Sequence, residues 1–163
     1  MTTHSPCVVV GYDGSPTARA AVELAVERVP DGGSVIVVNA YDLPADWYGW
    51  PAYSELLHVP QSRGSELLER VAADVPALDR VAYETELIGG RAAASLEAVA
   101  EARHAREIIV GTRGFGPVRA LLGSVAHELL HVARRPVTVV PVRAIADEAA
   151  NNSTLDAAGA ARG

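Results

Sequence analysis

Residues 111–124 combine the residue types of a phosphate-binding loop. Glycines at positions 111, 114, 116 and 123 follow the apolar run Ile108–Val110 and lead to Ser124. Glycine lets backbone N–H groups line a concave surface, because no Cβ stands in the way of an anion. A helix beginning at Ser124 would add its free N–H groups and the positive end of its dipole, and Arg113 would add a cation. The pattern favours phosphate binding over the alternative of a plain strand-to-helix turn.

A second motif, HELLH at residues 127–131, lies in the helix that would follow this loop. Histidines one helical turn apart, with a glutamate as general base, form the zinc site of a class of metalloproteases. A zinc enzyme needs a third protein ligand, and no histidine follows His131. On a helical wheel both histidines fall opposite the predicted buried stripe, which is Val125, Leu129, Val132 and Ala133. We therefore expect an exposed histidine pair and no metal site.

Two other nucleotide-binding motifs are excluded. The chain contains no lysine, and a Walker A loop uses a lysine on the terminal phosphates. The segment GFGPVR at residues 114–119 has arginine where the dinucleotide-binding fingerprint has its last glycine. That segment also follows the fourth expected strand, whereas the fingerprint follows the first.

Short apolar runs alternate with helical patterns along the chain. Ser15 and Pro16 suit the N-cap and first position of a helix, and Pro60 is expected to interrupt a later one. Further helices are expected at residues 54–75, 92–104 and 124–133, and strands at Cys7–Tyr12, Ser34–Ala40, Val81–Ile88, Glu107–Val110 and Pro136–Val142. This alternation predicts an α/β fold, a doubly wound five-stranded parallel sheet with helices on both faces.

Ligands of doubly wound sheets bind at the carboxyl ends of the strands. Asp13, Ala40 and Gly111 all follow or end expected strands, so the glycine loop lies on the edge where a ligand is expected. Residues 41–53 hold both tryptophans. These aromatic side chains favour a loop that packs against the rest of the domain, and the alternative is a lid over a ligand.

Five short motifs, in this order, resemble the universal stress protein family. They are VVGYDGS at 9–15, VNAYD at 38–42, GTRG at 111–114, GSV at 123–125 and PVTVVP at 136–141. The resemblance extends over residues 6–143 and implies a Rossmann-like fold of the adenine nucleotide alpha hydrolase type. The eight residues between Gly114 and Gly123 are one fewer than in the ATP-binding branch of that family.

The resemblance also implies a ligand and the residues around it. The ligand is ATP with Mg²⁺, and cyclic AMP is an alternative in the same pocket. A binding module is favoured over a slow ATPase or phosphotransferase, because no well-placed general base or lysine is visible. The implied residues are Asp13 and Ala40 on the adenosine side with Gly11 before them, Gly111 and Gly114 bordering the ribose and phosphates with Arg113, and Gly123, Ser124 and Val125 on phosphate oxygens.

Length and composition predict one domain. The 163 residues are 49% hydrophobic, which suits a single core formed by residues 1–143. Residues 144–163 hold almost no large apolar side chain and are expected to be a disordered tail. The segment Pro136–Val142, placed at a sheet edge by the resemblance, is expected to pair with a second copy in a homodimer.

Charge and hydropathy limit the partners and the compartment. The formal net charge of -6, without a long basic run, gives no general attraction to nucleic acid. The apolar run Cys7–Val10 is far shorter than the ~20 residues of a membrane span, and no positively charged start precedes it. We expect a cytoplasmic protein without membrane contact, in which the single cysteine, Cys7, is a buried and inert thiol.

Overall fold

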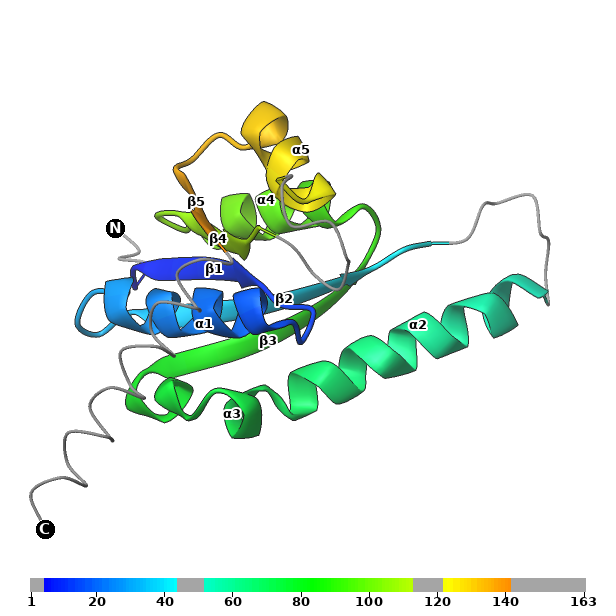
Figure 1. Cartoon of the computed structure of the whole chain (residues 1–163), viewed down its shortest axis with the longest axis horizontal. Helices are drawn as coiled ribbons and strands as arrows, with labels where there is room; N and C mark the ends of the chain where they lie inside the picture. The colour runs from blue at the N-terminus through cyan, green and yellow to red at the C-terminus, as the bar shows by residue number, and fades with distance from the viewer. Residues whose placement is uncertain (1–4, 44–51, 113–121, 142–163) are drawn as a thin grey trace, which may run out of the picture.

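Five parallel strands form one sheet, and helices lie on both of its faces (Figure 1). The computed structural model describes residues 5–43, 52–112 and 122–141, with side chains from residue 58 onward in the second range. The strands lie in the order β3-β2-β1-β4-β5, which confirms the predicted fold class. Along the chain the elements are β1 Cys7–Gly11, α1 Pro16–Arg28, β2 Ser34–Tyr41, α2 Ala52–Glu69, α3 Val71–Asp74, a 3-10 helix Pro76–Arg80, β3 Ala82–Gly89, α4 Ala92–Ala102, β4 Ile108–Gly111, α5 Ser124–Val132 and β5 Val137–Val140.

The central strand β1 is buried on both faces. Val8 and Val10 pack in a core with α1 and α3, whereas Val9 packs in a second core with α4 and α5. This double burial explains why the strand is a continuous apolar run instead of an alternating one. The chain runs from β1 outward to β3 and then returns to β4 on the other side of β1. Such a reversal opens a crevice at the carboxyl ends of β1 and β4.

The start of α1 follows the local sequence. The Ser15 hydroxyl accepts a hydrogen bond from the backbone N–H of Ala18 at 3.2 Å, and Pro16 takes the first helical position. Gly14, just before the cap, has φ +79°, a conformation that glycine adopts without strain. The predicted cap is confirmed, and it fixes the loop that follows β1.

The expected interruption at Pro60 is wrong. Helix α2 continues through Pro60, and the chain breaks only at Arg70, before α3. The neighbouring strands explain the difference: a Cβ on Gly64 would lie 2.6 Å from Oδ1 of Asn39 and 2.5 Å from Leu87. Helix α2 therefore lies directly on β2 and β3. We attribute its continuity to this packing, since tertiary contacts routinely override local propensity.

Strands β3 and β5 are the two edges of the sheet, and the edge position of β5 is the one that the resemblance to the family implied. Among the described helices, none has the length and apolar character needed to span a membrane. The aromatic loop with Trp47 and Trp50, the residue Val142 and the expected tail lie outside the described residues.

The cysteine prediction is confirmed as far as burial goes. Cys7 is 3% exposed, and its thiol donates to the carbonyl oxygen of Arg103 at 3.3 Å. Burial raises the pKa of the Cys7 thiol above its ordinary value. A neutral buried thiol is a poor nucleophile.

Candidate functional site

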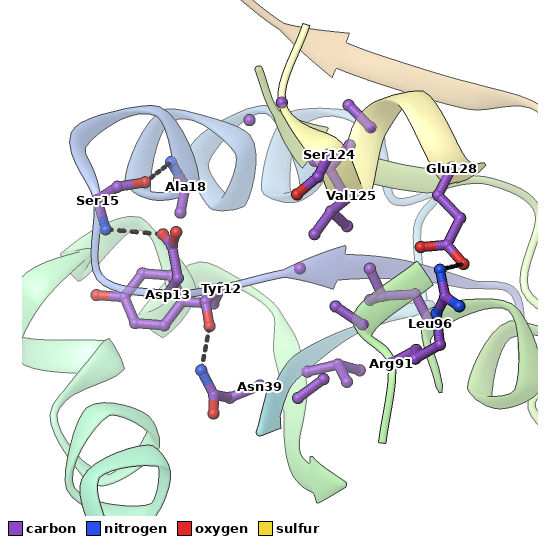
Figure 2. A pocket seen from close by; sticks show the side chains of 18 of the residues that line it. Tyr12, Asp13, Ser15, Ala18, Asn39, Arg91, Leu96, Ser124, Val125 and Glu128 are labelled. Carbon is purple, nitrogen blue, oxygen red and sulfur yellow. Dashed lines mark hydrogen bonds and ion pairs between the residues drawn. The ribbon is translucent and has the colours of Figure 1, made fainter. Parts of the chain in front are cut away.

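A pocket of about 490 Å³ opens at the carboxyl ends of β1, β2 and β4, in the crevice of the sheet (Figure 2). The structure brings together seven of the nine predicted site residues as lining of this pocket: Gly11, Asp13, Ala40, Gly111, Gly123, Ser124 and Val125. The other two, Arg113 and Gly114, lie outside the described residues. Their roles toward a ligand stay predictions.

Hydrogen bonds fix the β1 side of the pocket. The Asp13 carboxylate accepts from the backbone N–H of Ser15 at 3.0 Å, which holds the turn between β1 and α1. The side-chain amide of Asn39 donates to the carbonyl oxygen of Tyr12 at 2.8 Å, so the end of β2 supports the same turn. Figure 2 shows both bonds on one side of the pocket. Asp13 itself is exposed and available to a ligand.

Tyr12 ties this turn to the layer beneath it. Its side chain is 2% exposed, and the hydroxyl donates to Asp74 at 3.0 Å. Burial raises the pKa of Tyr12, and the hydrogen bond to Asp74 raises it further. The hydroxyl therefore remains protonated and keeps the bond to Asp74 at neutral pH.

The opposite side of the pocket is the start of α5. The backbone N–H of Gly123 donates to the carbonyl oxygen of Thr112, so the two ends of the glycine loop meet. Gly123 is the N-cap of α5 and offers no side-chain hydrogen bond to its first turn. The first-turn N–H groups, beside Ser124 and Val125, are therefore not capped by a side chain. Such a helix start attracts anionic groups.

One buried polar atom of the lining lacks a partner. The hydroxyl of Thr112, at the end of β4, makes no hydrogen bond within the part of the chain that the structure describes. Buried hydroxyls normally have a partner, and a bound ligand or water would supply one here.

Sequence reasoning missed one wall of the pocket, which comes from α4 and the side of α5. Arg91, Ala92 and Leu96 contribute from the start of α4, and Glu128 from α5. The signal for Arg91 was present, because it follows Gly89 and Gly90 at the carboxyl end of β3, the edge where ligands bind. Glu128 belongs to the HELLH motif, and its place in that motif does not indicate that it lines the pocket.

The HELLH segment is a surface feature with one residue turned to the pocket. His127 and His131 are exposed, as predicted, with ring centroids 5.0 Å apart. Glu128, which would be the general base of a zinc protease, forms an ion pair with Arg91 at 2.9 Å in the pocket lining. Across the described ranges, no three possible metal ligands come together.

The predicted buried stripe of α5 needs a correction. Leu129 is buried, but Val132 is 40% exposed and Ala126 is buried in its place. Val125 and Ala133 lie partly buried at the margins of this core. Val132 is the last residue of α5, and a helical wheel does not take into account how far along the helix its neighbours extend.

Removing both histidines is expected to change neither stability nor ligand affinity. A protein with His127→Ala and His131→Ala should unfold within ~0.5 kcal/mol of the parent, because both side chains are exposed. Chemical denaturation measures this difference, and elemental analysis of the parent measures bound metal. One zinc per chain in the parent, lost in the double variant, would contradict the prediction.

The fold and the pocket together define a class: an α/β domain with a ligand crevice at the switch point of a parallel sheet and an uncapped helix N-terminus facing it. The model of the universal stress protein family matches residues 7–141. The chain belongs to the universal stress protein family.

Relatives by sequence agree with this assignment. A universal stress protein of Thermus aquaticus is 35% identical over 82% of this chain and 96% of its own length. A universal stress protein of Mycobacterium tuberculosis is 32% identical over 83% of this chain, which spans only 45% of that relative.

Solved structures share the fold. The hypothetical protein MJ0577 has a TM-score of 0.72 at 19% identity, covering 85% of this chain and 97% of its own. A universal stress protein in complex with cAMP has a TM-score of 0.62 at 23% identity, covering 85% and 98%. A third, from Archaeoglobus fulgidus in complex with dAMP, has a TM-score of 0.54 at 21% identity, covering 83% and 96%.

Proposed function

We propose that this universal stress protein binds an adenine nucleotide, ATP with Mg²⁺, in the pocket at the carboxyl edge of the sheet. In this proposal it acts in the cytoplasm as a nucleotide-dependent stress-response module. The observation that carries the proposal is the convergence of three distant motifs, which contribute Asp13, Ala40 and Ser124, on one pocket of about 490 Å³. Pockets for small ligands have volumes of roughly 300–1,000 Å³.

The phosphates would lie at the start of α5. The uncapped N–H groups of its first turn and the Ser124 hydroxyl offer donors, and the helix dipole favours negative charge. The unpartnered hydroxyl of Thr112 is a further donor on that side. The adenosine would lie toward Asp13 and Ala40, at the ends of β1 and β2.

The acidic lining fits a nucleotide that brings its own cation. The described lining holds the carboxylates of Asp13, Asp42 and Glu128 against the single guanidinium of Arg91. Mg²⁺ prefers oxygen ligands and is commonly held by one or two carboxylates together with nucleotide phosphates. Such an ion would neutralise phosphate charge in a chain that has no lysine.

Cyclic AMP is the second candidate ligand, because a structural neighbour is a complex with it. Calorimetric titration with ATP, AMP and cyclic AMP, each with and without Mg²⁺, ranks the candidates. Phosphate release measured on the same samples distinguishes binding from slow hydrolysis. We expect ATP with Mg²⁺ to bind most tightly; binding of cyclic AMP alone would change the ligand, and no binding by any of the three would overturn the proposal.

We also propose that the chain forms a homodimer through the edge strand β5, the core of the expected segment Pro136–Val142. The carbonyl oxygens of Pro136 and Val140 accept hydrogen bonds from β4. Backbone groups alternate in direction along a strand, so those of Val137 and Val139 point away from the sheet. An edge with open N–H and C=O groups invites a partner strand.

Replacing Val139 with proline tests this edge. The change removes an outward N–H while leaving the hydrogen bonds to β4 in place, since proline is tolerated on edge strands. Loss of the donor should shift the dimer toward monomer by about tenfold in dissociation constant. Analytical ultracentrifugation measures the shift.

The matched control is Val139→Ala, which loses the side chain and keeps the N–H. It should retain the parent's dissociation constant within about threefold. A parent that sediments as a monomer at micromolar concentration would contradict the dimer, and equal effects of proline and alanine would show that the backbone edge is not the contact.

A further inference from the structure

Arg91 occupies a position where its charge is unfavourable for the helix that it begins. It is the N-cap residue of α4, with φ -65° and ψ 126°, and its side chain makes no capping bond. The N-terminal end of a helix carries partial positive charge, so a cation there is destabilising. The backbone is fixed, because the carbonyl oxygen of Arg91 accepts from Ser95 at 2.9 Å and Gly90 donates to Tyr41 at 2.9 Å. A carboxylate outside α4 would offset part of this charge.

That carboxylate is Glu128 of α5. The guanidinium Nη2 of Arg91 lies 2.9 Å from Oε1 of Glu128, and both residues line the pocket. Figure 2 shows the pair on the far side of the pocket from Asp13. Glu128 follows Ser124 by four residues, so the two side chains share one face of α5, about 6 Å apart along its axis. An arginine side chain spans such a distance.

The ion pair between Arg91 and Glu128 is weak, and no other cation is available to a ligand in the described lining of the pocket. The side chain of Arg91 is 79% exposed and that of Glu128 is 30% exposed, and exposed ion pairs exchange partners at little cost. Arg91 is also the one cation among the lining residues that the structure describes. A phosphate carries more charge than a carboxylate and matches the planar fork of a guanidinium.

We propose that the Arg91–Glu128 ion pair is a displaceable clasp through which the pocket distinguishes nucleotides by their phosphates. A polyphosphate at the start of α5 takes Arg91 from Glu128, and the released carboxylate opposes the added negative charge. Adenosine has no phosphate and leaves the pair intact. The inference rests on the proposed function and deepens it, because it names the residue, Arg91, for which the nucleotide phosphate and the carboxylate of Glu128 compete.

Titration of adenosine and magnesium-ATP into Arg91→Gln and Glu128→Gln tests the clasp. Arg91→Gln should lower the ratio of ATP affinity to adenosine affinity about tenfold, because the phosphate loses its guanidinium. Glu128→Gln should raise the same ratio about threefold, because Arg91 no longer has a competing carboxylate.

The matched controls are Arg134→Gln and Glu101→Gln. Arg134 is 77% exposed, close to the 79% of Arg91, and lies 3.5 Å from Glu101 of α4, which is 62% exposed; neither Arg134 nor Glu101 is among the residues that line the pocket. These variants carry the same charge changes and should leave the ratio within about twofold.

A uniform loss for both ligands in Arg91→Gln would mean that Arg91 only supports the fold, and the clasp would be wrong. An unchanged ratio in both pocket variants would contradict it equally. If the parent binds neither adenosine nor ATP, the proposed function itself fails. Binding by the parent with an unaltered ratio removes only the clasp, so the two failures are distinguishable.

Discussion

Replacing Ser124 with aspartate is expected to lower the affinity for magnesium-ATP at least about thirtyfold, or ~2 kcal/mol. Ser124 is the first residue of α5, and it is exposed and lines the pocket. In the proposed complex its hydroxyl and the first-turn N–H groups hold phosphate oxygens. Aspartate removes the hydroxyl donor and places a fixed negative charge where the phosphate would lie.

In the absence of ligand, Ser124→Asp should make the protein slightly more stable than the parent. The first turn of α5 has no acidic residue, and Gly123 provides no side-chain cap. A carboxylate at a helix N-terminus typically adds ~0.3–1 kcal/mol of stability. A variant that binds ATP poorly but unfolds no more easily than the parent has therefore lost the phosphate site and not the fold.

Calorimetric titration and thermal unfolding of the same preparations measure both effects. Ser124→Asn is the matched control, because it has nearly the shape of aspartate without the charge. We expect it to lose less than about fivefold in ATP affinity. Equal affinities for the parent and the aspartate variant would place the phosphates elsewhere in the pocket.

The second large effect concerns stability: Gly111→Ala should destabilise the fold by about 2 to 3 kcal/mol. A Cβ on Gly111 would lie 2.5 Å from Oγ1 of Thr17, 2.7 Å from its Cβ and 2.9 Å from its carbonyl carbon. Thr17 is buried in the first turn of α1, where its hydroxyl lies 3.2 Å from that of Ser15. Helix α1 and strand β4 would have to separate to admit the methyl group.

Thermal and chemical unfolding of the variant measure this cost, which should lower Tm by roughly 5–10 °C. A double-mutant cycle with Thr17→Ala separates the clash from other effects. Thr17→Ala removes the nearest atom but keeps the Cβ and the backbone, so it should restore only part of the loss in Gly111→Ala, with a coupling of at least ~0.5 kcal/mol. Additive effects would show that these two residues do not collide.

Gly111 belongs to the family motif, but the contact that requires a glycine there lies outside the motif. The resemblance to the family placed this glycine beside the ribose and phosphates, and it does line the pocket. The contact that excludes a side chain there, however, is with Thr17 of α1. The missing Cβ lets the end of β4 lie directly against α1.

Features that depend on neighbours a few residues away could be predicted without the structure. The apolar run of β1 and the cap at Ser15 each predicted their elements, because burial and capping are local requirements. The order of strands and motifs then placed Asp13, Ala40 and Gly111 at the carboxyl ends of strands, where the structure shows a shared pocket.

Contacts between residues far apart in the chain could not be predicted from the sequence, because they depend on how the helices pack on the sheet. The continuity of α2 through Pro60 depends on packing against β2 and β3, and no local signal reports that packing. The ion pair of Arg91 with Glu128 joins the start of α4 to α5, and no local sequence pattern indicates that these two residues meet. Ion pairs and close packing are set by the distances between elements in space, and those distances are fixed only when the sheet has brought the helices together.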